Sequence, residues 1–70
     1  MKLTVNGQPR ECDAANLADL WRSETAGLEI AELRGFAISL NGAVVRRTAW
    51  LTTPVHEGDA VEIIRAMSGG

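Results

Sequence analysis

Residues 36–45 read FAISLNGAVV, and this stretch predicts a β-hairpin. Before the turn, a large apolar side chain occupies every second position, which is the period of a strand that buries one face. The pair Asn41-Gly42 then tolerates the positive φ angles that a two-residue hairpin turn requires. Residues 43–45 return as the second strand, so the middle of the chain is expected to lie in an antiparallel part of a sheet.

A second hairpin is expected at the start of the chain, where Leu3 and Val5 alternate with polar residues. It turns at Asn6-Gly7, the same pair that closes the first hairpin. Its return strand is expected to cover about residues 8–13. Two such short copies are too few for a repeat architecture, so the likeness reflects hairpin chemistry used twice.

A helix is expected between the two hairpins, over about residues 17–25. Asn16 is a suitable N-cap, and the apolar residues that follow share one face at helical spacing. Trp21 lies on that face and is therefore expected in the core. Gly27 can end the helix as a C-cap. The apolar spacing of residues 27–35 fits neither a helix nor a strand, so a loop or a short helical turn is expected there.

The rest of the chain completes the sheet. Residues 46–53 indicate an irregular crossing with a short helical turn, and residues 60–65 form a final strand rich in β-branched residues. The element order predicts an α+β fold of the β-grasp, or ubiquitin-like, roll: a mixed four- to five-stranded sheet with one main helix packed across one face. We expect a β-grasp domain at 1–65 and a flexible tail at 66–70 that ends in Gly-Gly.

Length and composition exclude several functions. A chain of 70 residues allows one domain with one core, and 46% hydrophobic and 23% charged residues are typical of a globular protein. Seven basic and nine acidic residues give a formal charge of -2. No broad cationic field draws in phosphates, so nucleic acid is not an expected partner. The pair Arg46-Arg47 is expected to be a solvated loop.

Cysteine use and hydropathy indicate the compartment. Cys12 is the only cysteine, so no intramolecular disulfide can form, and a secreted domain of this size without one would be unusual. No apolar run is long enough for a signal peptide or a membrane span. We expect a cytoplasmic protein that does not associate with a membrane.

Nothing in the sequence predicts catalysis by this chain. It has no glycine-rich nucleotide-binding motif, no Cys-x-x-Cys pair and no set of metal ligands. His56 is expected to be a solvated loop residue, and Cys12 to be a packing residue of the second strand. The chain is therefore expected not to be an enzyme and to bind no metal.

The C-terminus is the candidate site, because Gly69-Gly70 places a carboxylate at the end of a slim tail. Without Cβ atoms, two glycines can thread a narrow channel of another protein. The terminal carboxylate is ionised at neutral pH and can attack the α-phosphate of ATP. This chain lacks the cations and phosphate cradle for that reaction, so a partner must supply them. Near the tail, Ile64 is expected on the face opposite Val61 and Ile63, where it can anchor a partner.

Several segments together resemble the ThiS family of sulfur carriers. They cover nearly the whole chain, and the second half is the specific part. The segments are Val5-Asn6-Gly7, Leu40-Asn41-Gly42-Ala43-Val44-Val45, Arg47-x-x-Trp50, Thr53-Pro54, Gly58-Asp59-x-Val61-Glu62-Ile63 and the terminal Gly69-Gly70.

The resemblance implies a β-grasp fold and a role as protein co-substrate in building the thiazole of thiamin. An E1-like adenylyltransferase of the ThiF type uses ATP to adenylate the terminal glycine, and a sulfur donor system converts it to a thiocarboxylate. Gly70 is then the modified residue and Gly69 the slim residue beside it. Ala66, Met67 and Ser68 form the tail that enters partner sites, including a ThiG-type thiazole synthase. The chain itself binds no cofactor.

Two alternatives stay open. The first is a carrier that resembles the small subunit of molybdopterin synthase, or one that serves another sulfur-containing metabolite. The second is of a different class, a ubiquitin-like interaction module or modifier. Loss of Gly70 abolishes a carrier's activity and leaves its stability nearly unchanged, whereas Ile64→Ala harms a pure interaction module more.

Overall fold

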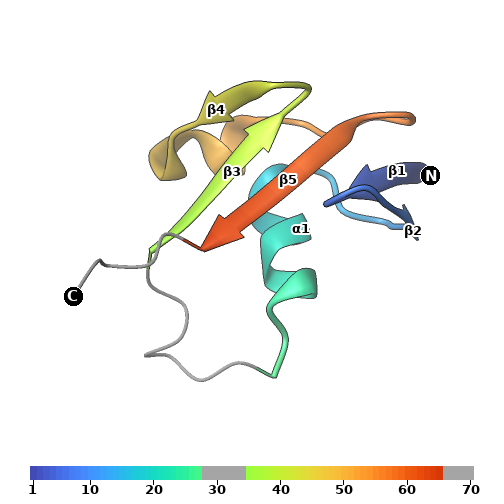
Figure 1. Ribbon diagram of the computed structural model, residues 1–70, viewed down its shortest axis with the longest axis horizontal. Helices are drawn as coiled ribbons and strands as arrows, with labels where there is room; N and C mark the ends of the chain where they lie inside the picture. The colour runs from blue at the N-terminus through green and yellow to red at the C-terminus, as the bar shows by residue number, and fades with distance from the viewer. Residues whose placement is uncertain (28–34, 66–70) are drawn as a thin grey trace.

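A five-stranded mixed sheet forms the centre of the computed structural model, which describes residues 1–27 and 35–65 (Figure 1). The strand order is β2-β1-β5-β3-β4. Only the β1–β5 pair is parallel, and the other neighbours are antiparallel. This confirms the expected mixed sheet. The strands are β1 (Lys2–Val5), β2 (Gln8–Glu11), β3 (Phe36–Leu40), β4 (Ala43–Val45) and β5 (Ala60–Arg65).

Both hairpins turn at their Asn-Gly pairs, as predicted. The two asparagines have φ angles of 52° and 51°, and the glycines after them also lie at positive φ. These values are typical of the turn that matches the right-handed twist of paired strands. The first return strand is shorter than the predicted 8–13, because pairing with β1 ends at Glu11. Beyond it, the chain turns away toward the helix, although the Cys12 N–H still donates to the Met1 carbonyl and the Cys12 carbonyl accepts from the Met1 ammonium.

The helix α1 (Leu17–Glu24) begins where the sequence predicts it. The Asn16 side-chain oxygen accepts a hydrogen bond from the backbone N–H of Asp19 at 2.9 Å, which satisfies one free donor of the first turn. At the other end Thr25 is the cap residue, and its hydroxyl donates to the Trp21 carbonyl at 2.7 Å. The predicted cap Gly27 lies two residues further on, at a φ of 94°. Residues 28–34, the main part of the expected loop, lie outside the described residues.

The crossing between β4 and β5 contains a 3₁₀ helix, η2 (Arg47–Thr52), in agreement with the predicted short helical turn. Trp50 is buried in it, and its indole N–H donates to the Val45 carbonyl at 2.9 Å. Two backbone hydrogen bonds then join the crossing to the start of α1, one of them from Leu17 N–H to the Thr53 carbonyl. The helix and the crossing are thereby held together as one layer.

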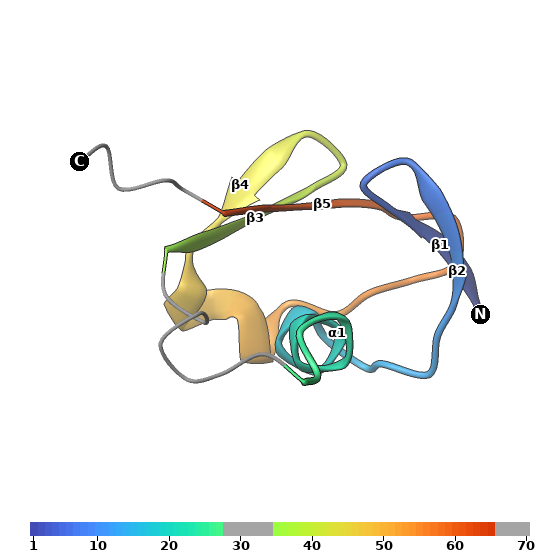
Figure 2. The ribbon, with the colours of Figure 1, turned by 60° about the horizontal axis from the view of Figure 1, so that its bottom comes forward.

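The core lies between the sheet and this layer, and Figure 2 shows α1 and η2 on the same side of the sheet. Full burial of an aliphatic side chain stabilises the fold by about 1.5–3 kcal/mol. Trp21 is buried, as predicted, and contacts Trp50 with ring centroids 5.5 Å apart. The other face of the sheet carries no layer from the described residues. The core residues are Leu3, Val5, Leu17, Leu20, Trp21, Ile38, Trp50, Val55 and Val61.

Candidate functional site

The central strand β5 directly precedes the predicted reactive tail in the sequence. It lies between β1 and β3 and ends at Arg65, which pairs with Phe36. The two turn asparagines, Asn6 and Asn41, both bind its backbone through their side-chain amides. The strand that leads to the tail is therefore held along its length, by β1 and Asn41 near its start, by Asn6 at Ile63 and by β3 as far as Arg65. The tail residues Ala66, Met67, Ser68, Gly69 and Gly70 lie outside the described residues, so their roles stay predictions.

The face of β5 opposite the core confirms the predicted position of Ile64. Val61 is 1% exposed and faces the core, whereas Ile64 is 53% exposed on the open face. In the sheet Ile64 is paired with Ala37 of β3. Ile64 therefore contacts solvent six residues before Gly70.

The open face carries a second exposed aliphatic residue, which the sequence analysis missed. Val44 of β4 is 77% exposed and is paired with Ser39, which is itself paired with Glu62 of β5. The alternation in β4 could have predicted this, because Val45 faces the core and its neighbour must then face outward. We name the set formed by Ala37, Ser39, Val44, Glu62 and Ile64 the open-face patch. It combines two large aliphatic side chains with one carboxylate and one hydroxyl.

Aromatic rings fill the helix side of the sheet near the tail root. The Arg65 guanidinium lies 5.9 Å from the Phe36 ring, and the Phe36 ring lies 6.0 Å from the Trp21 ring in an edge-on arrangement. The Arg47 guanidinium lies over both indoles, 4.8 Å from Trp21 and 5.4 Å from Trp50. The expectation of a solvated Arg46-Arg47 loop is therefore wrong for Arg47. It is exposed, but the start of η2 directs its side chain across the two tryptophans.

The other candidate residues show no catalytic arrangement in the described part of the chain. The His56 side chain is exposed, as predicted, and lies 3.9 Å from an Asp59 oxygen. Cys12 is half-buried against the core just after β2, so its packing role is as predicted although its place in the strand is not. Residues 1–27 and 35–65 hold no group of three or more metal-ligating side chains.

A surface groove of about 410 Å³ lies beside α1. Four carboxylates and one arginine line it, so its net charge disfavours an anionic ligand such as ATP. The lining residues are Arg10, Glu11, Cys12, Asp13, Ala14, Asp19, Leu20, Ser23 and Glu24. In the two described ranges, no helix is long and apolar enough to cross a membrane.

A β-grasp sheet whose central strand leads to a terminal Gly-Gly defines a class, the ubiquitin-like carrier proteins. Within that class, the model of the ThiS family matches residues 3–70. This chain belongs to the ThiS family, a family of sulfur carriers. The resemblance seen in the sequence is thereby confirmed.

Solved structures agree with this assignment. The chain is similar to the crystal structure of the thiamine biosynthesis protein ThiS from Geobacter metallireducens, with 38% identity over 100% of both chains and a TM-score of 0.79. It is also similar to the solution NMR structure of a thiamine biosynthesis protein from the same organism. There the identity is 40% over 100% of this chain and 88% of the other, and the TM-score is 0.71. A search of curated proteins finds no match.

Proposed function

We propose that this chain carries sulfur for formation of the thiazole of thiamin, with the Gly70 carboxylate as the working group. The observation that carries the proposal is the match to the ThiS family, which extends to Gly70 and so includes the Gly-Gly end. The similar structures support the thiamin pathway over the molybdopterin alternative, because both are of thiamine biosynthesis proteins.

The chemistry begins with activation of the terminal carboxylate. One of its oxygens attacks the α-phosphate of ATP, the bond to the β-phosphate breaks, and pyrophosphate leaves. The product is a mixed anhydride between Gly70 and AMP. Sulfide delivered by a donor system then attacks the acyl carbon and displaces AMP, and loss of the sulfur-bound proton leaves the carrier as a thiocarboxylate. A ThiG-type thiazole synthase takes sulfur from that group.

Partners supply the catalytic machinery. The open-face patch and the acidic groove present no phosphate cradle, and ATP needs cations that offset its charge. An E1-like adenylyltransferase of the ThiF type therefore binds the ATP, and this chain acts as a co-substrate without a cofactor of its own. The lone Cys12 supports a reducing compartment, and the proposed place of the reaction is the cytoplasm.

The family match supports a proposed role for each of the carrier's own residues. Ala66, Met67, Ser68 and Gly69 form the tail that enters the partner, and Gly70 reacts. Ile64 and the rest of the open-face patch bind the partner outside its channel, because an exposed isoleucine beside the tail gains from burial.

Pyrophosphate exchange tests the proposal. The chain is mixed with the adenylating enzyme, ATP and labelled pyrophosphate, and label entering ATP reports reversible adenylate formation. We expect exchange with the full chain and none with a variant that lacks Gly70, although both fold equally well. Equal exchange with and without Gly70 would contradict the proposal.

A further inference from the structure

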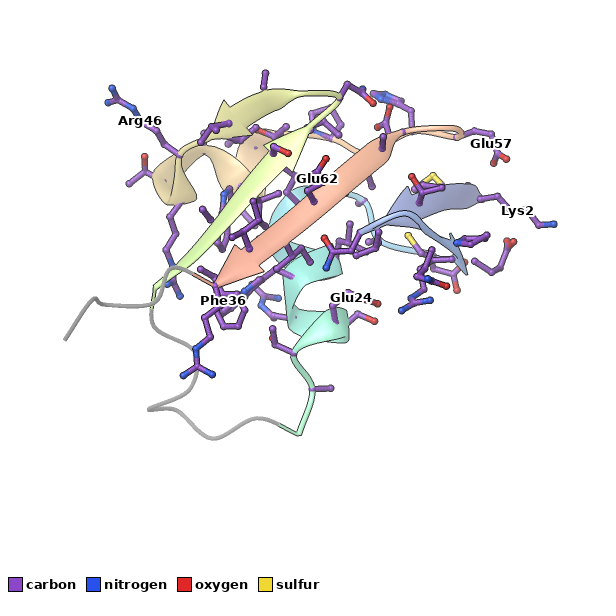
Figure 3. All side chains as sticks on the ribbon, viewed as in Figure 1. Lys2, Glu24, Phe36, Arg46, Glu57 and Glu62 are labelled. Atoms are coloured by element: carbon purple, nitrogen blue, oxygen red, sulfur yellow. The ribbon has the colours of Figure 1, made fainter. Side chains whose placement is uncertain are left out.

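Three arginines lie at the edge of the sheet from which the tail leaves. β3 runs antiparallel to both of its neighbours, so β5 ends, and β4 ends, where β3 begins. Arg65 is the last residue of β5, and Arg46 and Arg47 directly follow β4. Figure 3 shows Arg46 and Phe36 at this end of the molecule and Glu57 at the opposite end.

Stacking on aromatic rings orients two of these arginines. The guanidinium of Arg47 lies on the two tryptophans, and that of Arg65 lies on Phe36. Stacking leaves the planar N–H donors of a guanidinium free to bind a carboxylate in a bidentate manner. All three arginines are exposed. Their side chains are thus partly ordered before a partner binds, which reduces the entropy cost of binding.

The carboxylates of the described residues do not neutralise this edge. Their ion pairs are with Met1, Arg10, Arg22 and His56. None of these pairs, within residues 1–27 and 35–65, involves Arg46, Arg47 or Arg65. Glu57 and Asp59 precede β5 and lie at the far end of the strand. Among residues 1–27 and 35–65, the edge where β5 ends is therefore positive, although the chain has a net charge of -2.

We propose that Arg46, Arg47 and Arg65 form an arginine collar that docks on a carboxylate-lined protein surface at the mouth of the channel that receives the tail. This inference rests on the proposed function and names the chemistry of the adenylating partner's surface. The collar binds protein carboxylates and not the phosphates of ATP. Five tail residues in extended form span up to about 18 Å, so a tail that is extended in the channel leaves the collar at the channel mouth.

Charge reversal tests the collar. Arg46→Glu is the main variant, because Arg46 is exposed and its side chain makes no ion pair or ring-stacking contact within residues 1–27 and 35–65. Arg65→Glu is the second, and Arg22→Glu is the matched control, since Arg22 lies on the solvent face of α1 with its side chain 67% exposed. The readout is the KM for the carrier in ATP–pyrophosphate exchange at low and high salt. Circular dichroism checks that each variant folds.

We expect Arg46→Glu and Arg65→Glu each to raise the KM about tenfold at low salt, with kcat little changed. The effect should shrink as salt screens the charges, and Arg22→Glu should change the KM less than about twofold. If the wild-type chain is active and the collar variants change the KM no more than Arg22→Glu does, the proposed role of the collar is wrong and the proposed function stands. If the wild-type chain supports no exchange, both are overturned.

Discussion

The side-chain amide of Asn6 makes two hydrogen bonds with the backbone of Ile63: its Oδ1 accepts from the Ile63 N–H at 2.8 Å, and its Nδ2 donates to the Ile63 carbonyl at 3.2 Å. The parallel pairing of β1 with β5 stops at Val61. The Asn6 amide therefore binds the β5 backbone two residues closer to the tail than the strand pairing reaches. Asn41 acts similarly at the start of the strand, where its Oδ1 accepts from the Ala60 N–H at 2.9 Å.

Two substitutions of Asn6 distinguish the contribution of its turn conformation to stability from the contribution of these hydrogen bonds. Glycine tolerates the φ of 52° but loses both bonds, so Asn6→Gly should lower the free energy of unfolding by about 1–2 kcal/mol. Asn6→Ala should cost roughly 1 kcal/mol more, because alanine is strained at positive φ. Urea denaturation measures both. If Asn6→Gly unfolds at the wild-type urea concentration, the amide bonds contribute nothing to stability.

The open-face patch predicts a variant with lower affinity for the partner and normal stability. Ile64→Ala should raise the KM for the carrier in adenylation about tenfold, because burial of an exposed aliphatic anchor is lost. Its free energy of unfolding should stay within about 0.5 kcal/mol of wild type. Leu51→Ala is the matched control, since Leu51 is also exposed, at 62%, but lies on η2. Equal effects of the two variants would show that the patch has no special role.

The tail predicts a steric block at Gly69. A valine there adds a branched side chain next to the reacting carboxylate, so Gly69→Val should reduce adenylation about 100-fold through misplacement of that group. Stability should be unchanged. Ser68→Val serves as the control one residue further from Gly70 and should have a smaller effect. Similar rates for Gly69→Val and wild type in single-turnover adenylation would rule out a narrow channel at this position.

The N-terminus predicts a pH dependence of stability. The Met1 ammonium donates a hydrogen bond to Glu11 at 3.0 Å, and this bond raises the pKa of the amino group above its ordinary value of 8.0. The folded state thus holds this proton more tightly than the unfolded state does. The resulting stabilisation is fully present below pH 8 and is lost as the pH rises through the raised pKa.

Glu11→Gln should weaken that dependence, because the hydrogen bond to Glu11 is the largest cause of the raised pKa. Urea denaturation between pH 7 and about pH 10 gives the difference in stability between wild type and the variant, so contributions of other groups cancel. The wild type should lose more stability than Glu11→Gln over this window. Parallel stability curves would show that the ion pair does not contribute.

Local patterns predicted most of the fold. The Asn-Gly pairs predicted both turns, and Asn16 together with the apolar face of α1 predicted the helix. Both features depend on short-range preferences of the residues themselves. Alternation placed Ile64 outward for the same reason. The end of β2 was predicted two residues too late, since it depends on where pairing with β1 stops.

Contacts between distant segments could not be predicted in this way. The side chain of Asn6 reaches a strand 57 residues away, and Arg47 stacks on an indole of α1. Both residue types also suit solvated turns, so the sequence favoured that simpler interpretation. For the site, alternation predicted one of the two exposed aliphatic residues of the open-face patch. The reactivity of the tail stays a prediction, which a biochemical experiment must test.

Intact-mass spectrometry tests the central claim most directly. The protein is purified from cells that contain the adenylating enzyme and the sulfur donor system, and its C-terminal fragment is sequenced by mass. We predict a gain equal to the difference between a sulfur and an oxygen atom, localised to Gly70. An unchanged mass, in a sample whose partner enzymes are shown to be active, would contradict the sulfur-carrier account.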